Sequence, residues 1–317
     1  MSSRPPAVSV IVPAWGVAHL VGEALASLQR QTFGDWEAIV VDDGAPDDVA
    51  GAVAPFSAVD PRIRFLATEH GGISAARNRA MTAARAPIVA LLDGDDAYEP
   101  EYLARMVALI LADPDRGFVC CDATFMGGSE RDGELYSKYA SQAGEPTLEA
   151  VLARRFHVFT AVVARKEALA QVGGWDEALP AGEDLDLWLR MLGEGWRAAY
   201  LPLPLVRYRR RAASLSASGV RINRATLTVY GKAVARLGDR PEARVARAMI
   251  PRMREETAWA EGEELIVAGR TRAGLALLRA AQARRRSTRW RCAMALFRVA
   301  PFLAKPMIAR RLWRPPA

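Results

Sequence analysis

Two clusters of aspartates in the sequence could hold a metal ion. Asp42 and Asp43 follow the apolar residues 39–41, and Asp93-Gly94-Asp95-Asp96 follows the apolar residues 88–92. Carboxylates packed together repel one another and need a cation, and Mg²⁺ or Mn²⁺ is typically held by one or two carboxylates together with substrate phosphates. Asp and Gly also form ordinary turns, so either cluster alone is more typical of a turn. Both clusters together favour a site for a divalent metal ion and a diphosphate.

The apolar segments before these clusters are predicted to be strands of one sheet. Strands are expected at residues 8–13, 37–42, 63–66 and 88–92, and helices at residues 18–31 and 74–83. This alternation predicts a doubly wound, mostly parallel sheet with helices on both faces. In such sheets the ligand lies outside the carboxyl ends of the strands. The two aspartate clusters should therefore face one crevice, although they are far apart in the sequence.

The rest of the chain divides into a less regular part of the sheet domain and a helical region. We expect helices at residues 100–112 and 182–192, strands near 118–121 and at 158–164, and a Gly- and charge-rich insertion at 127–144. From about residue 218 the alternation stops, and Ala- and Arg-rich helices are expected at 225–237, 241–269 and 272–283. The sequence thus predicts an α/β domain at residues 1–216 and a helical, Arg-rich region at residues 217–317.

Two acidic residues, Glu183 and Asp184, begin the helix expected at residues 182–192. The apolar residues in register on one side of that helix are Leu185, Trp188, Leu189 and Leu192. Acidic residues in a first helical turn commonly cap the helix and offset its dipole. A carboxylate held rigidly against the core by such a stripe could instead act as a general base.

Several segments together resemble the family 2 glycosyltransferases of the GT-A fold. They are Val8-Ser-Val-Ile-Val-Pro-Ala-Trp15, Gln31-Thr-Phe33, Val40-Val-Asp-Asp-Gly44, Gly71-Gly-Ile-Ser-Ala-Ala-Arg-Asn78, Leu92-Asp-Gly-Asp-Asp96, Val172-Gly-Gly-Trp-Asp-Glu177 and Gly182-Glu-Asp-Leu-Asp-Leu-Trp-Leu-Arg190. The resemblance spans residues 8–216 in the family's order and spacing. It implies a GT-A catalytic domain at residues 1–216 that transfers a sugar from a UDP-, dTDP- or GDP-sugar.

The resemblance also implies where the donor binds. Asp42 would hydrogen-bond the nucleobase, while the residues near the base, the ribose and the rest of the donor would be Pro13, Ala14, Asp43 and Arg77. These residues come from the first two predicted strands and the helix at 74–83. The expected donor site therefore lies in the N-terminal half of the sheet.

The metal site is implied by the second aspartate cluster. Asp93 and Asp95 stand at the positions of the family's DxD motif, where Asp95, with Asp96 beside it, would meet the ribose and bind Mg²⁺ or Mn²⁺. One departure concerns the segment Tyr208-Arg209-Arg210-Arg211, where members of the family often read Tyr-Arg-x-His. A histidine ligand is therefore missing, and an arginine at that position could contact the diphosphate instead.

On the acceptor side, the resemblance favours catalysis by the acidic pair over capping. Asp184 would be the general base, with Glu183 beside it, and Trp175 and Trp188 would shape the acceptor side. Displacement at an anomeric carbon needs a base for the acceptor proton and an electrophile for the leaving diphosphate. A single displacement inverts the anomeric configuration. The acceptor is expected to be a glycan, a lipid-linked glycan or another cell-surface or secondary-metabolite acceptor.

Two other functions are alternatives. A sugar-1-phosphate nucleotidyltransferase also uses a doubly wound sheet and Mg²⁺, but a Gly-rich, basic phosphate loop would follow its first strand. Here that place holds Pro13-Ala-Trp-Gly-Val17, without Lys or Arg. A non-catalytic nucleotide-sugar binding protein is the second alternative, against which the intact Asp42, Asp95 and Asp184 argue.

Composition bears on the compartment and on the partners. The net charge is +7, yet residues 284–317 contain ten Lys or Arg and no Asp or Glu, so the remaining residues carry a net charge of −3. The basic character belongs to the tail, and no nucleic-acid partner is expected. Three cysteines without a disulfide or zinc spacing fit a reducing compartment. With no signal-peptide core and no spanning segment, we expect a cytoplasmic protein, either soluble or peripheral at the inner face of a membrane.

The tail suggests how a peripheral contact could form. Arginines at positions 284–286, 289 and 291 precede the apolar stretches 294–297 and 299–303, and Trp290 and Trp313 flank them. Basic and apolar residues mixed in this way suit an interfacial helix on an anionic membrane. Because Pro301 and Pro306 interrupt a long helix, the membrane-docking element should be short. A solvated helix packed on the catalytic domain is the alternative.

Overall fold

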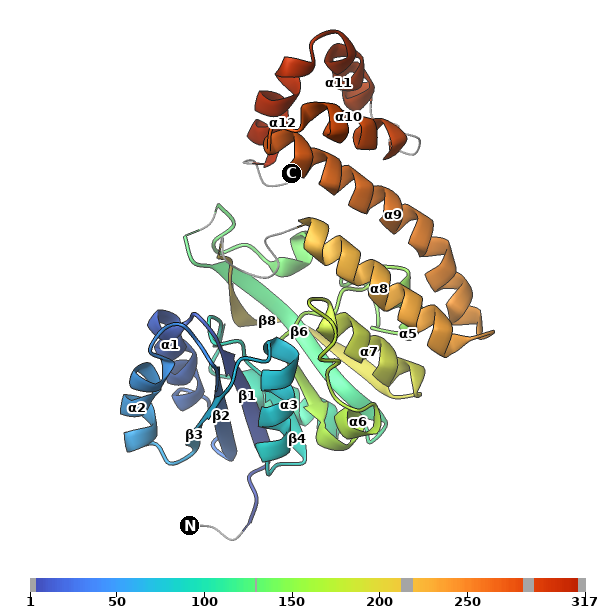
Figure 1. The fold of residues 1–317 in the computed structure, drawn as a ribbon. Coiled ribbons are helices and arrows are strands. Elements are labelled where there is room, and N and C mark those ends of the chain that lie inside the picture. Colours follow the sequence, from blue (N-terminus) through green and yellow to red (C-terminus); the bar gives the residue numbers. More distant parts are fainter. Residues whose placement is uncertain (1–3, 129, 212–218, 282–287, 313–317) are drawn as a thin grey trace.

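A single mixed sheet forms the centre of the protein. Within residues 4–128, 130–211, 219–281 and 288–312, which the computed structural model describes, the sheet has eight strands in the order β3-β2-β1-β4-β7-β6-β8-β5 (Figure 1). The strands are β1 (Val8–Ala14), β2 (Trp36–Asp43), β3 (Ile63–Thr68), β4 (Ile88–Leu91), β5 (Ala97–Tyr98), β6 (Arg116–Met126), β7 (Val162–Arg165) and β8 (Arg197–Arg209). The α/β class predicted from the sequence is confirmed.

The helices of the sheet domain connect and cover these strands. They are α1 (Ala18–Gln29), α2 (Val49–Val59), α3 (Ile73–Ala83), α4 (Tyr102–Leu111), α5 (Leu148–Leu152), α6 (Lys166–Gln171) and α7 (Glu183–Gly193), with a 3₁₀ turn, η1 (Tyr136–Lys138). The sequence predicts α1, α3, α4 and α7 but not α2. Pro55 lies inside α2 and breaks the helical pattern that would have indicated it.

Two strands of the sheet, β7 and β5, run opposite to the others. β3, β2, β1 and β4 are all parallel, as predicted. β7, however, is antiparallel to both β4 and β6, and β5 is antiparallel to β8, while β6 and β8 are parallel. Six strands therefore run in one direction, and the prediction of a mostly parallel sheet is confirmed, with β7 and β5 reversed. Antiparallel strands beside a parallel set are common in large α/β sheets.

Alternate residues of the central strands enter two separate cores. Along β1, the side chain of Ile11 packs in the core under α3 and α7, whereas Val10 and Val12 pack in the core under α1 and α4. Successive side chains of a strand point to opposite faces. The residues of β1 are buried on both faces, which explains its continuous apolar sequence and confirms the prediction of helices on both sides.

The C-terminal region is helical, as predicted. It comprises α8 (Gly219–Leu237), α9 (Pro241–Val267), α10 (Thr271–Ala280), α11 (Thr288–Val299), the 3₁₀ turn η4 (Pro301–Leu303) and α12 (Ala304–Leu312). α8 packs on α7, and the first part of α9 packs on α5 and α8. The Tyr230 hydroxyl of α8 donates to the Leu152 carbonyl at 2.6 Å. The predicted boundary between residues 216 and 217 lies outside the described residues.

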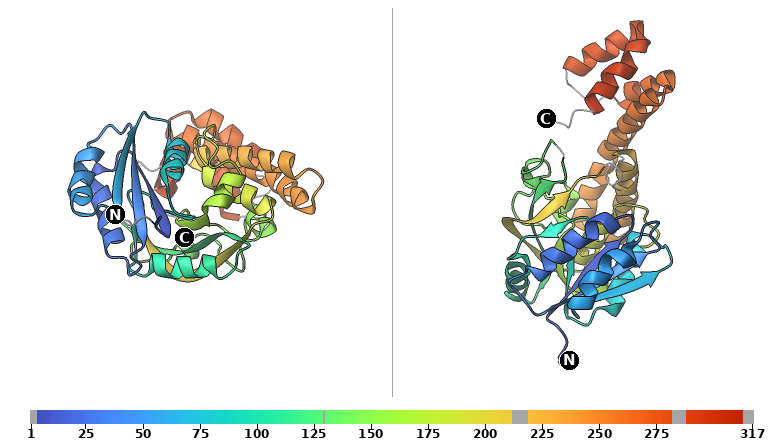
Figure 2. Two further views of the ribbon diagram at one scale, coloured as in Figure 1. Left: turned by 90° about the horizontal axis from the view of Figure 1, so that it is seen from below. Right: turned by 90° about the vertical axis from the view of Figure 1, so that its left-hand side faces the viewer.

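Helices α10, α11 and α12 gather at the far end of α9, away from the sheet (Figures 1 and 2). They enclose a third core, which includes Trp259, Leu278 and Phe297. α9 and α10 approach closely because Gly262 and Gly274 face each other: a Cβ at Gly262 would lie 2.9 Å from the Gly274 carbonyl oxygen. Among the described residues, no helix is long and apolar enough to cross a bilayer.

Candidate active site

The side chain of Arg77 joins three carboxylates at the carboxyl edge of the sheet. Its Nη1 donates to Glu183 Oε1 at 2.9 Å and to Asp184 Oδ1 at 2.8 Å, and its Nη2 donates to Asp93 Oδ1 at 3.0 Å. Arg77 lies on α3, Asp93 lies in the loop after β4, and the two other acids form the first turn of α7. The structure thereby brings four predicted site residues together from three separate segments.

This cluster is buried and carries more negative than positive charge. The Arg77 side chain is 1% exposed, and that of Asp93 is 26% exposed. Burial opposes the charge of the guanidinium, but the charges of Asp184, Asp93 and Glu183 outweigh it, so the pKa of Arg77 lies above its ordinary value. Burial raises the pKa of Asp184 to about 7, because Arg77 only partly offsets burial and the charges of Glu183 and Asp93. A carboxylate with a pKa near 7 suits general-base catalysis at neutral pH.

Glu183 and Asp184 do not cap the helix that they begin. The N-cap of α7 is Gly182, in the left-handed conformation with φ 73°, and it makes no side-chain capping bond. Both acids instead bind Arg77, and the Trp175 Nε1 donates to Asp184 Oδ1 at 3.0 Å. Trp175 is itself buried. Asp184 Oδ1 is thus fixed by two donors, while its Oδ2 accepts no hydrogen bond within the part of the chain that the structure describes.

Helix α7 is buried on nearly every side, which differs from the single apolar stripe expected. Leu187 and Met191 are as buried as Trp188, whereas Leu185 is partly exposed. Met191 faces β6, since a Cβ at Gly117 would lie 3.1 Å from its Cε. α8 covers the side of Asp186, which pairs with Lys232. The sequence pattern of α7 alone could not reveal these neighbours. Trp188 packs against Phe118 of β6, with ring centroids 4.8 Å apart. Its side chain is 1% exposed, so little of its surface is open to an acceptor.

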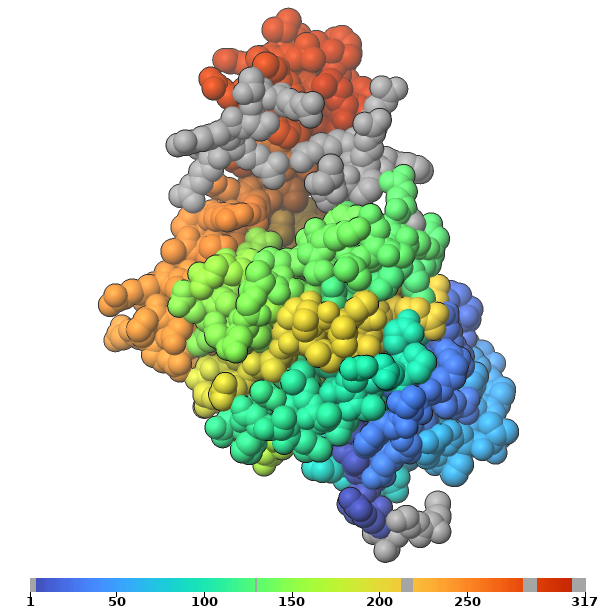
Figure 3. All heavy atoms as spheres, turned by 180° about the vertical axis from the view of Figure 1, so that it is seen from behind, coloured from blue at the N-terminus to red at the C-terminus, as the bar shows by residue number. Residues whose placement is uncertain are grey.

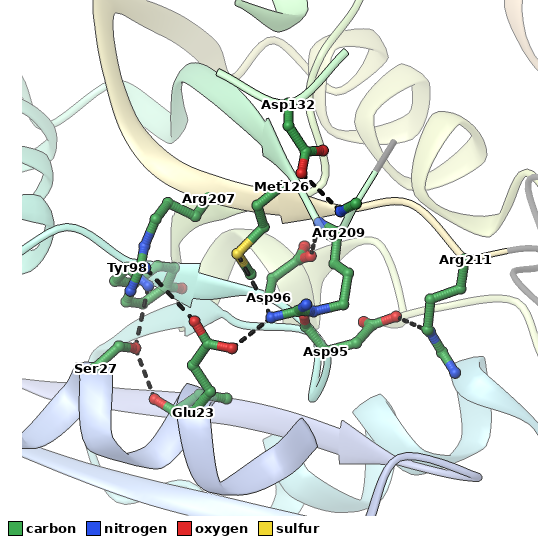
Figure 4. Close-up of polar contacts among 12 residues, drawn as sticks. Glu23, Ser27, Asp95, Asp96, Tyr98, Met126, Asp132, Arg207, Arg209 and Arg211 are labelled. Atoms are coloured by element: carbon green, nitrogen blue, oxygen red, sulfur yellow. Dashed lines mark hydrogen bonds and ion pairs between the residues drawn. The ribbon is translucent and has the colours of Figure 1, made fainter. Parts of the chain in front are cut away.

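The second aspartate cluster is bound by arginines of β8 and the residues that follow it (Figure 4). Asp95 Oδ2 accepts from Arg211 Nε at 2.6 Å. The Arg209 backbone N–H donates to Asp96 Oδ1 at 2.8 Å, and Arg209 Nε donates to the Asp95 carbonyl at 3.0 Å. Arg209 also forms an ion pair with Glu23 of α1. Arg211 therefore meets Asp95 at the position where a histidine was expected from the resemblance.

The carboxylates of Asp95 and Asp96 are candidate ligands of a metal ion. Burial and the charges of neighbouring aspartates raise the pKa of Asp95 and, more strongly, that of Asp96. The cluster thus holds unrelieved negative charge, which a hard cation would relieve. Among the described residues, no three His, Cys, Asp or Glu side chains form a preformed metal site. The residues fit an ion that takes one or two ligands from the protein and others from a bound phosphate.

The two predicted metal ligands differ in access. The Asp95 side chain is 15% exposed. Asp96 is buried, and one of its oxygens is occupied by the backbone of β8. Gly94, within the second cluster, approaches β1, since a Cβ there would lie 3.0 Å from the Pro13 carbonyl oxygen. Asp95 is therefore the more accessible candidate ligand of the two.

The predicted donor residues lie at the carboxyl ends of β1 and β2. Pro13 and Asp42 are partly exposed, whereas Ala14 and Asp43 are buried. Asp42 Oδ1 accepts from the Ala45 amide at 2.8 Å. The Asp43 carboxylate accepts from the amides at positions 71 and 72, at 2.9 and 2.8 Å. Asp43 therefore anchors the loop before α3, and Asp42 is the carboxylate that is open to a ligand.

β8 contributes site residues that the sequence analysis did not assign. Arg207 lies 3.5 Å from Glu23 and from Glu99, and Arg209 binds Glu23 and the second aspartate cluster. Residues 207 and 209 are spaced by two, which places them on one face of β8, and Arg211 continues this spacing just beyond the strand. That spacing was the available signal, but β8 was not among the predicted strands.

Comparisons with known proteins agree with this architecture. The model of the family "Glycosyl transferase family 2" matches residues 9–170, just over half of the chain. The putative teichuronic acid biosynthesis glycosyltransferase TuaG of Bacillus subtilis is 26% identical over 73% of this chain and 89% of its own length. The O-antigen biosynthesis protein RfbC of Myxococcus xanthus is 28% identical over 71% of this chain. Of the first three curated relatives, the chain spans only 17–27% of their length.

Solved structures share the fold. S. aureus TarS 1-349 in complex with UDP-GlcNAc has a TM-score of 0.63 at 17% identity, covering 95% of this chain and 90% of that one. The mannosyltransferase PcManGT from Pyrobaculum calidifontis, in complex with GDP-Man and Mn²⁺, has a TM-score of 0.60 at 23% identity, covering 96% and 87%. These likenesses confirm the predicted GT-A fold with C-terminal helices. Because the family model matches more than half of the chain, the protein belongs to the family 2 glycosyltransferases.

Proposed function

We propose that this protein transfers a sugar from a nucleotide diphosphate sugar to a hydroxyl acceptor, with inversion at the anomeric carbon. The observation that carries the proposal is the joining of Asp93, Glu183 and Asp184 by the buried Arg77. This contact links the aspartate cluster after β4 to a carboxylate whose pKa is about 7. A site that places a base beside acidic residues at the ends of strands is suited to displacement of a diphosphate.

In the proposed reaction, Asp184 is the general base. Its carboxylate accepts the proton of the acceptor hydroxyl while the acceptor oxygen forms a bond to the anomeric carbon. The bond between that carbon and the diphosphate oxygen breaks on the opposite face, and the nucleoside diphosphate leaves with the electron pair. Arg77 and Trp175 hold Asp184 in place, which limits the reorganisation needed during proton transfer.

On the donor side, Asp42 and Asp95 are the proposed contacts. The exposed edge of Asp42, with Pro13 and Ala14, would bind the nucleobase and ribose. Asp95, with Asp96 behind it, would hold Mg²⁺ or Mn²⁺ beside the diphosphate. The cation, when bound, offsets negative charge on the leaving group. The GDP-Man and Mn²⁺ complex of PcManGT and the UDP-GlcNAc complex of TarS support a nucleotide-sugar donor.

The acceptor is proposed to be a growing glycan, free or linked to a lipid. TuaG and RfbC are named for teichuronic acid and O-antigen biosynthesis, which supports a role in polysaccharide synthesis. A location at the inner face of the membrane would suit such an acceptor. Nucleic acid is not a proposed partner.

Donor binding and turnover together test the proposal. The full chain is mixed with UDP-, dTDP- and GDP-sugars, with and without Mn²⁺, and both the Tm and the release of nucleoside diphosphate are measured. We expect one class of donor to raise the Tm with Mn²⁺ and to be turned over when an acceptor is present. A donor that raises the Tm but is not turned over with any acceptor would favour the non-catalytic alternative. The absence of any Tm shift would contradict the proposed donor site.

A further inference from the structure

The C-terminal helical module, made of α10, α11, η4 and α12, exposes a set of large apolar side chains. They are Leu296, Val299, Phe302 and Met307, and they are 41%, 87%, 75% and 44% exposed, respectively. We call these four residues the apolar face. Among the described residues, eleven large apolar side chains are exposed, and four of them fall within this stretch of twelve residues. The other seven are spread along the rest of the chain, as is normal for a protein surface.

The apolar face is not needed by the core of the module. That core takes Met294 and Phe297 from α11, and Ala304 and Ile308 from α12. In a helix, residues three and four apart share a side, so α11 presents one apolar side inward and a second one outward. Folding of the module requires only that the inward side of α11 be apolar. The outward side is therefore unexplained by folding.

Some of the tail residues that were expected to contact a membrane are buried instead. Met294 and Phe297 were expected in the interfacial stretch but are buried in the core of the module. Trp290 was expected at the interface, but its ring packs edge-on against Trp259, with centroids 4.7 Å apart. The arginines at 284–286 and Trp313 lie outside the described residues. The expected break at Pro301 is confirmed, since α11 ends at Val299 and η4 follows.

Basic side chains border the apolar face. Arg291, Arg298 and Lys305 are exposed on the same two helices. Residues 284–317 contain no Asp or Glu at all, so no acidic side chain in this part of the sequence opposes them. Cations beside exposed apolar groups match the chemistry of an anionic bilayer, in which phosphates lie above acyl chains.

We propose that the apolar face, with Arg291, Arg298 and Lys305, is a docking surface for an anionic lipid bilayer. The module stands at one end of the molecule, where α9 carries it away from the sheet (Figures 1 and 3). The carboxyl ends of β1 and β2 point to the same side of the molecule as α10–α12 (Figure 1). A bilayer at the module would thus lie on the side of the molecule toward which these strand ends point. This inference goes beyond the transfer reaction and does not depend on it.

Vesicle binding by the full chain tests the surface. The protein is sedimented with vesicles of phosphatidylcholine alone or mixed with phosphatidylglycerol. We expect binding to the anionic vesicles only, weakened by high salt. V299E/F302E is expected to lower the partition coefficient at least tenfold, because it places two carboxylates on the apolar face. The matched control is Val59→Glu, at an exposed valine on α2, and it should bind as the unchanged protein does.

A second variant and a local probe keep the test independent of folding. R298E/K305E reverses two cations and should also abolish binding to anionic vesicles. Cys292 is the exposed cysteine of α11, whereas Cys120 and Cys121 are buried. An environment-sensitive dye on Cys292 should shift its emission to the blue when anionic vesicles are added. This readout does not require turnover of any donor.

Three outcomes would overturn the proposal. The first is that the full chain stays in the supernatant with anionic vesicles at low salt. The second is that V299E/F302E and Val59→Glu bind equally well. The third is that V299E/F302E changes the oligomeric state in analytical ultracentrifugation without changing vesicle binding, which would identify the apolar face as a contact between copies of the chain.

Discussion

Arg77 and Arg211 both neutralise aspartates that follow β4, but they do so in different surroundings. Arg77 is 1% exposed and binds three carboxylates, from two separate segments of the chain. Arg211 is 26% exposed and pairs with one carboxylate, that of Asp95. The buried guanidinium of Arg77 cannot leave its partners, because buried carboxylates would then remain without a compensating charge. The partly exposed guanidinium of Arg211 can leave Asp95 for water at little cost, and another cation can then bind the Asp95 carboxylate.

The difference separates a fixed part of the site from an exchangeable part. Arg77 ties α3, the loop after β4 and α7 together, and so positions the proposed base. Arg211 pairs with Asp95, the proposed metal ligand, and would have to leave this carboxylate when a metal ion binds.

The largest effect is expected from Arg77→Met. The substitution leaves the buried carboxylates of Glu183 and Asp184, and the partly exposed one of Asp93, without their cation. The free energy of unfolding should fall by about 3–5 kcal/mol, as for other broken buried ion pairs, and transfer should be lost. Urea denaturation measures the first quantity. Arg105→Met, which removes an exposed pair with Glu101, is the control and should change stability by less than about 1 kcal/mol. Equal effects of the two variants would contradict a structural role for Arg77.

Asp95→Ala should abolish transfer while the fold stays intact. Without this carboxylate, the diphosphate and the remaining aspartates would repel each other with no cation held between them. The Tm without donor should be close to that of the unchanged protein, and the Mn²⁺-dependent rise in Tm with donor should disappear. Full activity of this variant in excess chelator would show that Asp95 holds no catalytic metal ion.

Asp184→Asn should keep donor affinity and lower kcat by a factor of about 100 or more, the usual loss when a general base is removed. Glu183→Gln is the matched control, since it also removes one negative charge bound to Arg77 but leaves the proposed base. Its kcat should fall much less. If both variants lose activity equally, the loss reflects the ion-pair cluster rather than proton transfer.

The pH dependence should follow Asp184. The base must be ionised to accept a proton, and burial raises its pKa to about 7. The value of kcat/KM should therefore fall roughly tenfold for each pH unit below 7 and level off above it. The residual activity of Asp184→Asn should lack this acidic limb. A profile that is flat from pH 5.5 to 7 would assign the base to another group.

The parallel half of the sheet was predictable because its strands are buried on both faces and read as continuous apolar runs. β8 was not predicted. It contains exposed prolines at positions 202 and 204 and alternating arginines, which in a sequence read as a loop rather than a strand. The motifs and the resemblance likewise identified the aspartate clusters and Asp184 as candidate site residues.

The contacts among those residues could not be predicted. Arg77 was expected only near the donor, yet it binds acids that lie 16, 106 and 107 positions further along the chain. No local pattern encodes such pairings, because they depend on how α3 and α7 pack on the sheet. The burial of α7 on several sides depends in the same way on β6 and α8.

The smallest effect is expected from Arg211→Ala, measured as Mn²⁺ binding without nucleotide. Removing the guanidinium leaves Asp95 Oδ2 free for the ion, so the Kd for Mn²⁺ should decrease. Partly exposed ion pairs contribute about 0.2–1 kcal/mol, so the decrease should be at most about fivefold. The free Mn²⁺ signal in electron paramagnetic resonance reports the Kd.

Arg210→Ala is the matched control, because Arg210 directly precedes Arg211 in the chain and is exposed. It removes the same charge from the segment, so a general electrostatic effect would move both Kd values alike. A decrease confined to Arg211→Ala would show that this arginine competes with the ion at Asp95. If the Kd instead rises in Arg211→Ala, then Arg211 supports metal binding, and the contrast with the fixed Arg77 no longer holds.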